Sequence, residues 1–160
     1  MRSEEKIRAA IERYEDTVRR LCMIHLKNEA DTQDIIQNVF LKYLLRKQPF
    51  ESPEHEKAWF IRVTLNACKD LLKSVFRSRT VPLETLNDYA ADISDDAREV
   101  LSAVMALPQG YRDVVYLHYY EGYTVPEIGA LLGKNRNTVY THLTRARQRL
   151  KEMLGGDGNG

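Results

Sequence analysis

The fold is decided by residues 124–154, TVPEIGALLGKNRNTVYTHLTRARQRLKEML. Thr124 and Glu127 stand at the spacing of a capping box, and a helix that begins there is expected to end at the following glycine. The turn 133–136 leads into a second helix predicted at 137–154, whose inward side is marked by Val139, Leu143, Ala146, Leu150 and Met153. A short capped helix, a glycine turn and a longer basic helix are typical of the helix-turn-helix, whose second helix enters the DNA major groove.

The charges of the chain are segregated, although the formal net charge is only +1. Residues 134–151 contain no acid, and residues 62–79 are basic apart from Asp70. Between them, residues 84–99 are acidic apart from Arg98. Two basic blocks separated by an acidic one predict two DNA-facing modules joined by a flexible acidic linker at 79–97.

Composition indicates a folded chain, because 43% of the 160 residues are hydrophobic, 29% are charged, and Gly and Pro are few. That length suits two small domains, which we expect at 1–78 and 98–155, followed by a disordered tail at 156–160. Apolar runs are far shorter than the roughly 20 residues that cross a bilayer, and the charged start does not resemble a signal peptide. We therefore expect a cytoplasmic protein without membrane insertion. Cys22 and Cys68 are expected to be buried free thiols.

Helical periodicity runs through the rest of the chain, and no strand alternation is evident, so the fold class is all-α. Helices are predicted at 5–27, at 29–45 after an Asn28 cap, and after Ser52 and Pro53. The inward side of this third helix is expected at Ile61, Leu65, Cys68, Leu72 and Val75. Beyond the linker, one helix is marked by Val100, Leu101, Val104 and Leu107, and the next by Tyr111, Val114, Val115 and Leu117.

Catalytic and metal-binding patterns are not found in the sequence, so neither an enzyme nor a cofactor is expected. The four histidines are scattered; His25 and His118 are predicted to pack in the core, whereas His142 could contact phosphate. The acids of residues 29–34 could suggest acid–base chemistry, but an acidic helix start is the simpler explanation, and no partner residues converge on them.

Nucleic-acid binding is the class of function that remains after enzymes and metal-binding proteins are set aside. The third helix carries a basic stripe on the face opposite its apolar side: Arg62, Asn66, Lys69 and Lys73. Trp59 lies one turn before it and has two open interpretations, a base-stacking platform or a core residue. The stripe itself is either a DNA surface or an ordinary solvated face.

Three stretches together resemble the extracytoplasmic-function (ECF) sigma factors of bacterial RNA polymerase. The first is ADTQDIIQNVFLK at 30–42, and the second is AWFIRVTLNACKD at 58–70. The third comprises Leu107-Pro108 through Arg112, Glu127-Ile128-Gly129, Thr138-Val139 and Arg145-Ala146-Arg147. The resemblance covers about residues 10–154, and Asn38 departs from the glutamate common in the family.

The resemblance implies a promoter-specificity subunit that binds core RNA polymerase and directs initiation at minus-10 and minus-35 elements. Docking on the beta-prime clamp helices would involve Asp31, Asp34, Gln37, Asn38 and Leu41. Minus-10 DNA would be held by Trp59, Arg62, Asn66, Lys69 and Lys73, with loop 49–56 capturing a flipped base. Minus-35 DNA would be read by Arg136, Thr138, Tyr140, Thr141, Thr144, Arg145, Arg147 and Lys151.

Further partners implied by the resemblance are the polymerase beta flap and an anti-sigma factor, and the free chain is expected to be a monomer. The alternative is a stand-alone helix-turn-helix transcriptional regulator. Such a regulator would bind paired half-sites as a dimer without polymerase.

Overall fold

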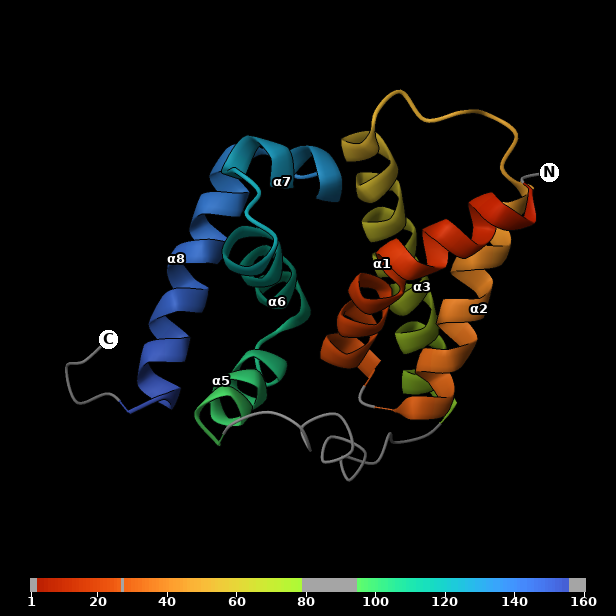
Figure 1. Ribbon diagram of the computed structural model, residues 1–160. Helices are drawn as coiled ribbons and strands as arrows, with labels where there is room; N and C mark the ends of the chain where they lie inside the picture. Colours follow the sequence, from red (N-terminus) through yellow and green to blue (C-terminus); the bar gives the residue numbers. More distant parts are fainter. Residues whose placement is uncertain (1–2, 27, 79–94, 156–160) are drawn as a thin grey trace. The chain divides into compact units, whose positions relative to one another are not determined.

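The computed structural model describes residues 3–26, 28–78 and 95–155. The chain divides into two units, Met1–Tyr89 and Ala90–Gly160 (Figure 1). All regular structure in the described ranges is helical, which confirms the all-α prediction. Most of the predicted acidic linker, residues 79–94, and the predicted tail, residues 156–160, lie outside the described residues.

The first unit contains α1 (Glu4–Leu26), α2 (Glu29–Leu45) and α3 (Pro53–Ser78). The side chain of Asn28 accepts a hydrogen bond from the Asp31 N–H at 3.0 Å, which caps α2 as predicted. Ser52 Oγ accepts the His55 N–H at 3.0 Å in the same way. The helix α3 begins at the next residue, Pro53, because proline is well suited to the first position of a helix. Local capping therefore sets the start of both helices.

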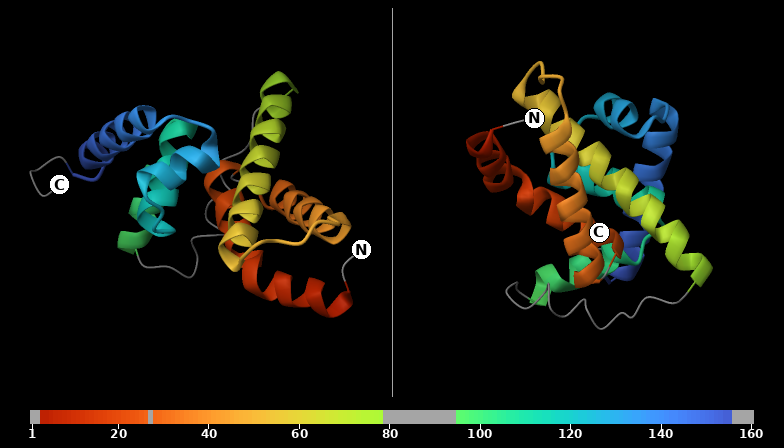
Figure 2. Two further views of the ribbon diagram at one scale, coloured as in Figure 1. Left: turned by 90° about the horizontal axis from the view of Figure 1, so that it is seen from above. Right: turned by 90° about the vertical axis from the view of Figure 1, so that its right-hand side faces the viewer.

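The core of the first unit is formed where α1 packs against both α2 and α3 (Figure 2). Phe60 is fully buried, and its ring stacks on that of Tyr14 with centroids 4.4 Å apart. Thr64 is also fully buried and donates its hydroxyl hydrogen to the Phe60 carbonyl at 2.7 Å, so its polar group is satisfied. The inward face of α3 thus includes Phe60 and Thr64, which the predicted stripe omitted.

Both cysteines are buried free thiols, as predicted, and their sulfur atoms lie 4.0 Å apart between α1 and α3. His25 is buried as expected. The side chain of Val75, the last member of the predicted stripe, lies outside the described residues.

The second unit contains α5 (Asp95–Met105), α6 (Gln109–Val115), the π-helical turn η1 (Tyr116–Tyr120), α7 (Val125–Leu132) and α8 (Arg136–Met153). The helix α6 and the helix α7 both pack against α8. Two residues predicted to face inward are exposed instead, Val100 at 47% and Met153 at 43%. Met153 is the last residue of α8, and the buried side of α5 is formed by Ala103 and Met105.

The helix-turn-helix is formed by α7, its turn and α8. Thr124 and Glu127 make both hydrogen bonds of the predicted capping box. Gly133 adopts a left-handed conformation with φ +68°, which glycine adopts without steric cost. Asn135 Oδ1 accepts the Thr138 N–H at 2.8 Å, so α8 begins at Arg136, one residue earlier than predicted.

Gly129 permits the close approach of this turn to α7. The Lys134 N–H donates to the Gly129 carbonyl at 2.9 Å. A Cβ atom on residue 129 would lie only 2.6 Å from the Lys134 carbonyl oxygen. The conformation of the turn therefore requires a glycine at position 129.

In the part of the chain covered by the structure, no helix combines the length and the hydrophobicity needed to cross a membrane.

Candidate nucleic-acid interface

The outward face of α8 carries nearly all of the residues predicted to read minus-35 DNA. Thr138 is half-buried near the helix start, and the other seven are exposed: Arg136, Tyr140, Thr141, Thr144, Arg145, Arg147 and Lys151. Tyr140 is 57% exposed, although tyrosine is a large and partly apolar side chain. Because the inward side of the helix is anchored by Val139, Leu143 and Ala146, these polar side chains are held on the other side.

The structure brings the central members of this set together in one shallow pocket. The pocket has a volume of about 240 Å³ and is lined by Tyr140, Thr141, Thr144 and Arg145. A hydroxyl pair, a phenol and a guanidinium at one place supply both donors and acceptors for base edges.

 

The flank of α8 that faces α6 is occupied by contacts within the unit. The His142 ring lies 5.2 Å from that of Tyr111, and Arg149 lies over the same tyrosine at 5.3 Å. Burial, together with the nearby cations Lys134 and Arg145, lowers the pKa of His142 below its ordinary value, so the ring is neutral at physiological pH. His142, which the sequence suggested as a phosphate contact, is half-buried beside Tyr111 of α6.

The basic stripe on α3 is accessible over most of its length. Arg62, Asn66 and Lys73 are exposed, and Lys69 is half-buried. Their spacing of three or four residues keeps them on one side of the helix. The stripe begins one turn after Trp59.

Trp59 is half-buried in an aromatic cluster with Tyr43, Phe50 and Phe60. Its ring centroid lies 5.0 Å from that of Phe60, 5.7 Å from that of Phe50 and 6.1 Å from that of Tyr43. The Arg46 guanidinium covers the outer rings, at 4.3 Å from Phe50 and 5.8 Å from Trp59. Trp59 thus packs against the core and remains partly accessible, and its use as a base-stacking platform stays a prediction.

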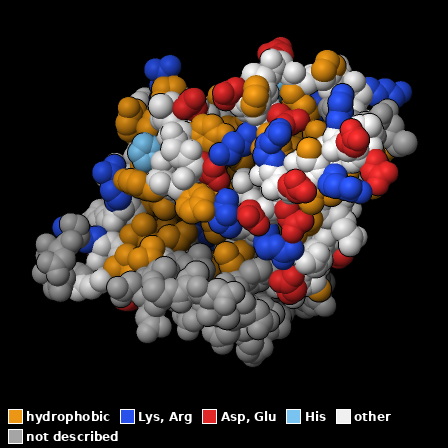
Figure 3. Space-filling view, in the orientation of Figure 1, with side chains coloured by type: hydrophobic (Ala, Val, Ile, Leu, Met, Phe, Trp, Pro, Cys, Tyr) orange, Lys and Arg blue, Asp and Glu red, His pale blue; other side chains and the backbone are white. Residues whose placement is uncertain are grey.

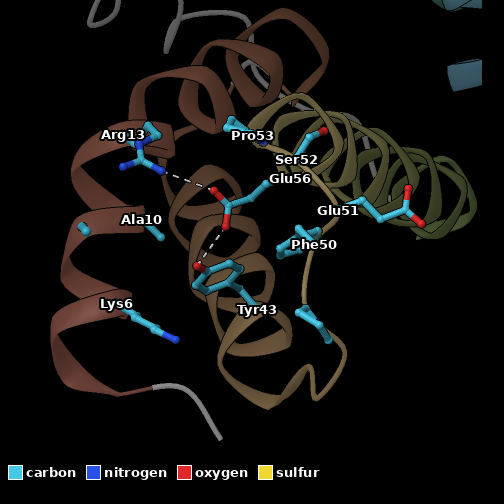
Figure 4. Close-up of a pocket in the computed structure, with 11 residues that line it drawn as sticks. Lys6, Ala10, Arg13, Tyr43, Phe50, Glu51, Ser52, Pro53 and Glu56 are labelled. Carbon is cyan, nitrogen blue, oxygen red and sulfur yellow. Dashed lines mark hydrogen bonds and ion pairs between the residues drawn. The ribbon is translucent and has the colours of Figure 1, made fainter.

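A carboxylate beneath this cluster joins the three helices of the first unit. Glu56 of α3 accepts hydrogen bonds from Tyr14 Oη of α1 at 2.8 Å and from Tyr43 Oη of α2 at 3.1 Å. Arg13 pairs with the same carboxylate at 3.4 Å (Figure 4). Burial and the bond to Glu56 raise the pKa of Tyr14 to about 12, so its hydroxyl stays protonated and donating.

Sequence reasoning missed Glu56, because an acid in the first turn of a helix has an ordinary explanation in the helix dipole. The available signal was the pair of tyrosines on the inward faces of α1 and α2. A buried tyrosine hydroxyl requires a hydrogen-bond partner.

The predicted docking face of α2 is outward-facing. Asp31 is half-buried, and the remaining four residues are exposed: Asp34, Gln37, Asn38 and Leu41. Leu41 is 51% exposed and Leu45, one turn further, is 59% exposed, so the polar face continues into an apolar end. Over α1 and α2, the view in Figure 3 shows acidic and basic side chains interspersed.

Within the described ranges, no group of three or more histidine, cysteine, aspartate or glutamate side chains is placed to hold a metal ion.

Comparison with known proteins identifies the two units separately. Residues 10–78 match the family described as Sigma-70 region 2, and residues 97–150 match Sigma-70, region 4. The RNA polymerase sigma factor SigV of Bacillus subtilis is 28% identical over 137 residues, which cover 84% of this chain and 82% of that protein. The ECF RNA polymerase sigma factor SigM of Mycobacterium tuberculosis is 29% identical over 146 residues, covering 89% and 74%.

A solved structure shares the fold. The sigma factor RpoE from Bartonella quintana, crystallised in complex with the anti-sigma factor NepR, has a TM-score of 0.75 and 19% identity. The match covers 96% of this chain and 99% of that one. Matches to both sigma-70 regions, in the order of the two units, show that the chain belongs to the ECF sigma factors, the promoter-recognition subunits of bacterial RNA polymerase.

Proposed function

We propose that the two units of this sigma factor divide promoter recognition between them, with α8 reading the minus-35 element and α3 holding the melted minus-10 strand. The observation that carries the proposal is the exposed face of α8, which contains no acid between residues 134 and 151. Such a face can approach the phosphate backbone without charge repulsion.

On α8, the proposed roles follow the position of each side chain. The pocket residues Tyr140, Thr141, Thr144 and Arg145 face base edges, where arginine pairs with guanine through two hydrogen bonds. The exposed cations further along the helix, Arg147 and Lys151, contact phosphates, which fix the register without specifying sequence. Arg136 and Thr138, at the helix start, complete the set.

On α3, the exposed Arg62, Asn66 and Lys73, with the half-buried Lys69, track the backbone of a single strand. Trp59 supplies a partly accessible ring beside them, on which an unpaired base can stack. The predicted capture segment 49–56 comprises the end of loop 46–52, which joins α2 to this helix, and the first turn of α3, and it would receive a flipped base.

On α2, the exposed face of Asp34, Gln37, Asn38 and Leu41, with Asp31 beside it, docks on the beta-prime clamp helices of core polymerase. The second unit would contact the beta flap. An anti-sigma factor is a further expected partner, since the related RpoE was crystallised with one.

The chain would act without covalent chemistry of its own, as sigma factors do, and as a monomer when free. Because its partner is the transcribing polymerase, it would work in the cytoplasm.

The test compares two variants of α8 in reconstituted holoenzyme. Arg145→Ala should change which minus-35 bases are tolerated, whereas Arg147→Ala should weaken binding to all sequences by a similar factor. Both residues are exposed on the same helix, so neither variant should unfold the unit. An unchanged base preference in Arg145→Ala would remove this residue from the reading face. Sequence-specific binding of the free chain as a dimer would favour the stand-alone regulator.

A further inference from the structure

The Glu56 carboxylate occupies an unusual position for a charged group, because its side chain is only 15% exposed. Three donors from two other helices converge on it: the hydroxyls of Tyr14 and Tyr43 and the guanidinium of Arg13. Figure 4 shows Arg13 and Tyr43 reaching it from α1 and α2. A buried carboxylate is tolerated only with such partners, and apolar residues would hold three helices together at least as well.

Tyr43 connects this carboxylate to the loop that precedes α3. Its ring stacks on Phe50 with centroids 6.1 Å apart and planes 9° apart. Phe50 in turn contacts Trp59 and, edge-on at 5.3 Å, the ring of His55. The orientation of Tyr43, fixed by its bond to Glu56, therefore sets the position of the loop and of Trp59.

The backbone of the loop is tied to the same turn of α3. The Glu51 N–H donates to His55 Nδ1 at 3.0 Å, and the Glu56 N–H donates to the Ser52 carbonyl at 3.1 Å. The end of the loop is thus held by hydrogen bonds to the first turn of α3, and Phe50 is held by ring stacking on Tyr43. Glu56 makes one of these backbone bonds and also bonds the Tyr43 hydroxyl.

A pocket of about 490 Å³ lies beside the carboxylate (Figure 4). Loop residues 49–52 and Pro53 at the start of α3 form one wall, and Lys6, Ala9, Ala10 and Arg13 of α1 form the opposite wall. Tyr43 and Glu56 complete the lining. The bonds of Glu56 to Arg13 and Tyr14 hold the first turn of α3, and with it the end of the loop, against α1, which limits the width of this pocket.

We propose that Glu56 is a positioning residue for capture of the melted minus-10 strand: through Tyr43 and Phe50 it holds loop 46–52 and Trp59 in the geometry that the strand meets. The proposal rests on the minus-10 role of the first unit proposed above. Tyr14 serves as the internal comparison, because it bonds the same carboxylate but stacks on the core ring of Phe60 rather than on the loop.

The experiment compares Tyr43→Phe with Tyr14→Phe, each of which removes one hydroxyl from Glu56, and adds Glu56→Gln. Affinity of the reconstituted holoenzyme is measured for a promoter already mismatched across the minus-10 region and for minus-35 duplex alone. Tyr43→Phe and Glu56→Gln should weaken binding to the mismatched promoter about five-fold, as expected for one lost hydrogen bond, and leave minus-35 binding unchanged. Tyr14→Phe should have a smaller effect on the mismatched promoter at similar thermal stability.

A second readout needs no polymerase, because Trp59 is the only tryptophan of the chain. Tyr43→Phe should increase acrylamide quenching of its fluorescence, whereas Tyr14→Phe should not. Equal losses of strand binding and stability in both tyrosine variants would reduce Glu56 to a structural role and overturn the inference. Failure of the wild-type holoenzyme to retain the mismatched promoter would instead overturn the minus-10 role itself, and the inference with it.

Discussion

Replacing Gly129 by alanine should disrupt the helix-turn-helix while leaving the first unit intact. The new Cβ would lie 2.6 Å from the Lys134 carbonyl oxygen, and this obstacle is backbone that is itself hydrogen-bonded to Gly129. This clash can be relieved only if the turn moves away from α7. Overpacking of this kind costs about 3 kcal/mol at its upper end, and the better helix propensity of alanine recovers about 1 kcal/mol. We expect a net loss of about 2 kcal/mol.

The assay uses the single tryptophan to separate the two units. Trp59 fluorescence follows unfolding of the first unit, and far-ultraviolet circular dichroism follows all helices. Gly129→Ala should lower the dichroism midpoint and leave the fluorescence midpoint unchanged. Gly110→Ala is the matched control, because its Cβ would meet only the ends of the His142 and Lys134 side chains at 3.4 Å. A wild-type dichroism transition in Gly129→Ala would refute the argument.

Three further outcomes are expected. Thr124→Ala should destabilise the second unit by about 1 kcal/mol through loss of the α7 cap, with Thr124→Ser restoring it in thermal melts. Because the pKa of Tyr14 is raised from 10 to about 12, its contribution is complete below pH 10 and is lost as pH rises toward 12; the denaturant midpoint should fall across that window, less so in Tyr14→Phe. Lys151→Ala should reduce the salt dependence of minus-35 binding by about one unit of slope without altering base preference, in affinity titrations at several salt concentrations.

Much of the fold followed from local signals in the sequence. The caps Asn28, Ser52 and Thr124 act through side-chain bonds to residues three positions away, which spacing alone reveals. Errors arose where the outcome depended on tertiary contacts. Val100 has the spacing expected of a buried residue, but the buried side of α5 is formed by Ala103 and Met105.

The sequence predicted which residues form the exposed surface of the candidate site, but not which contacts join residues on different helices. The exposed polar face of α8 follows from its apolar stripe, since the two sides of a helix are linked by its period. The bonds of Glu56 join residues 42 and 13 positions apart, and no local pattern reports them. The contact of His142 with Tyr111 was not foreseen for the same reason, because Tyr111 lies on another helix.

The most direct test of the central claim is promoter affinity at fixed salt, measured for the chain with and without core RNA polymerase. The proposed minus-10 and minus-35 surfaces lie on separate units, so the chain alone should bind weakly and core polymerase should make the binding tight and sequence-specific. Asp34→Ala combined with Gln37→Ala should abolish only the gain that polymerase provides. Nanomolar, sequence-specific binding by the isolated chain, unchanged when core polymerase is added, would contradict the account.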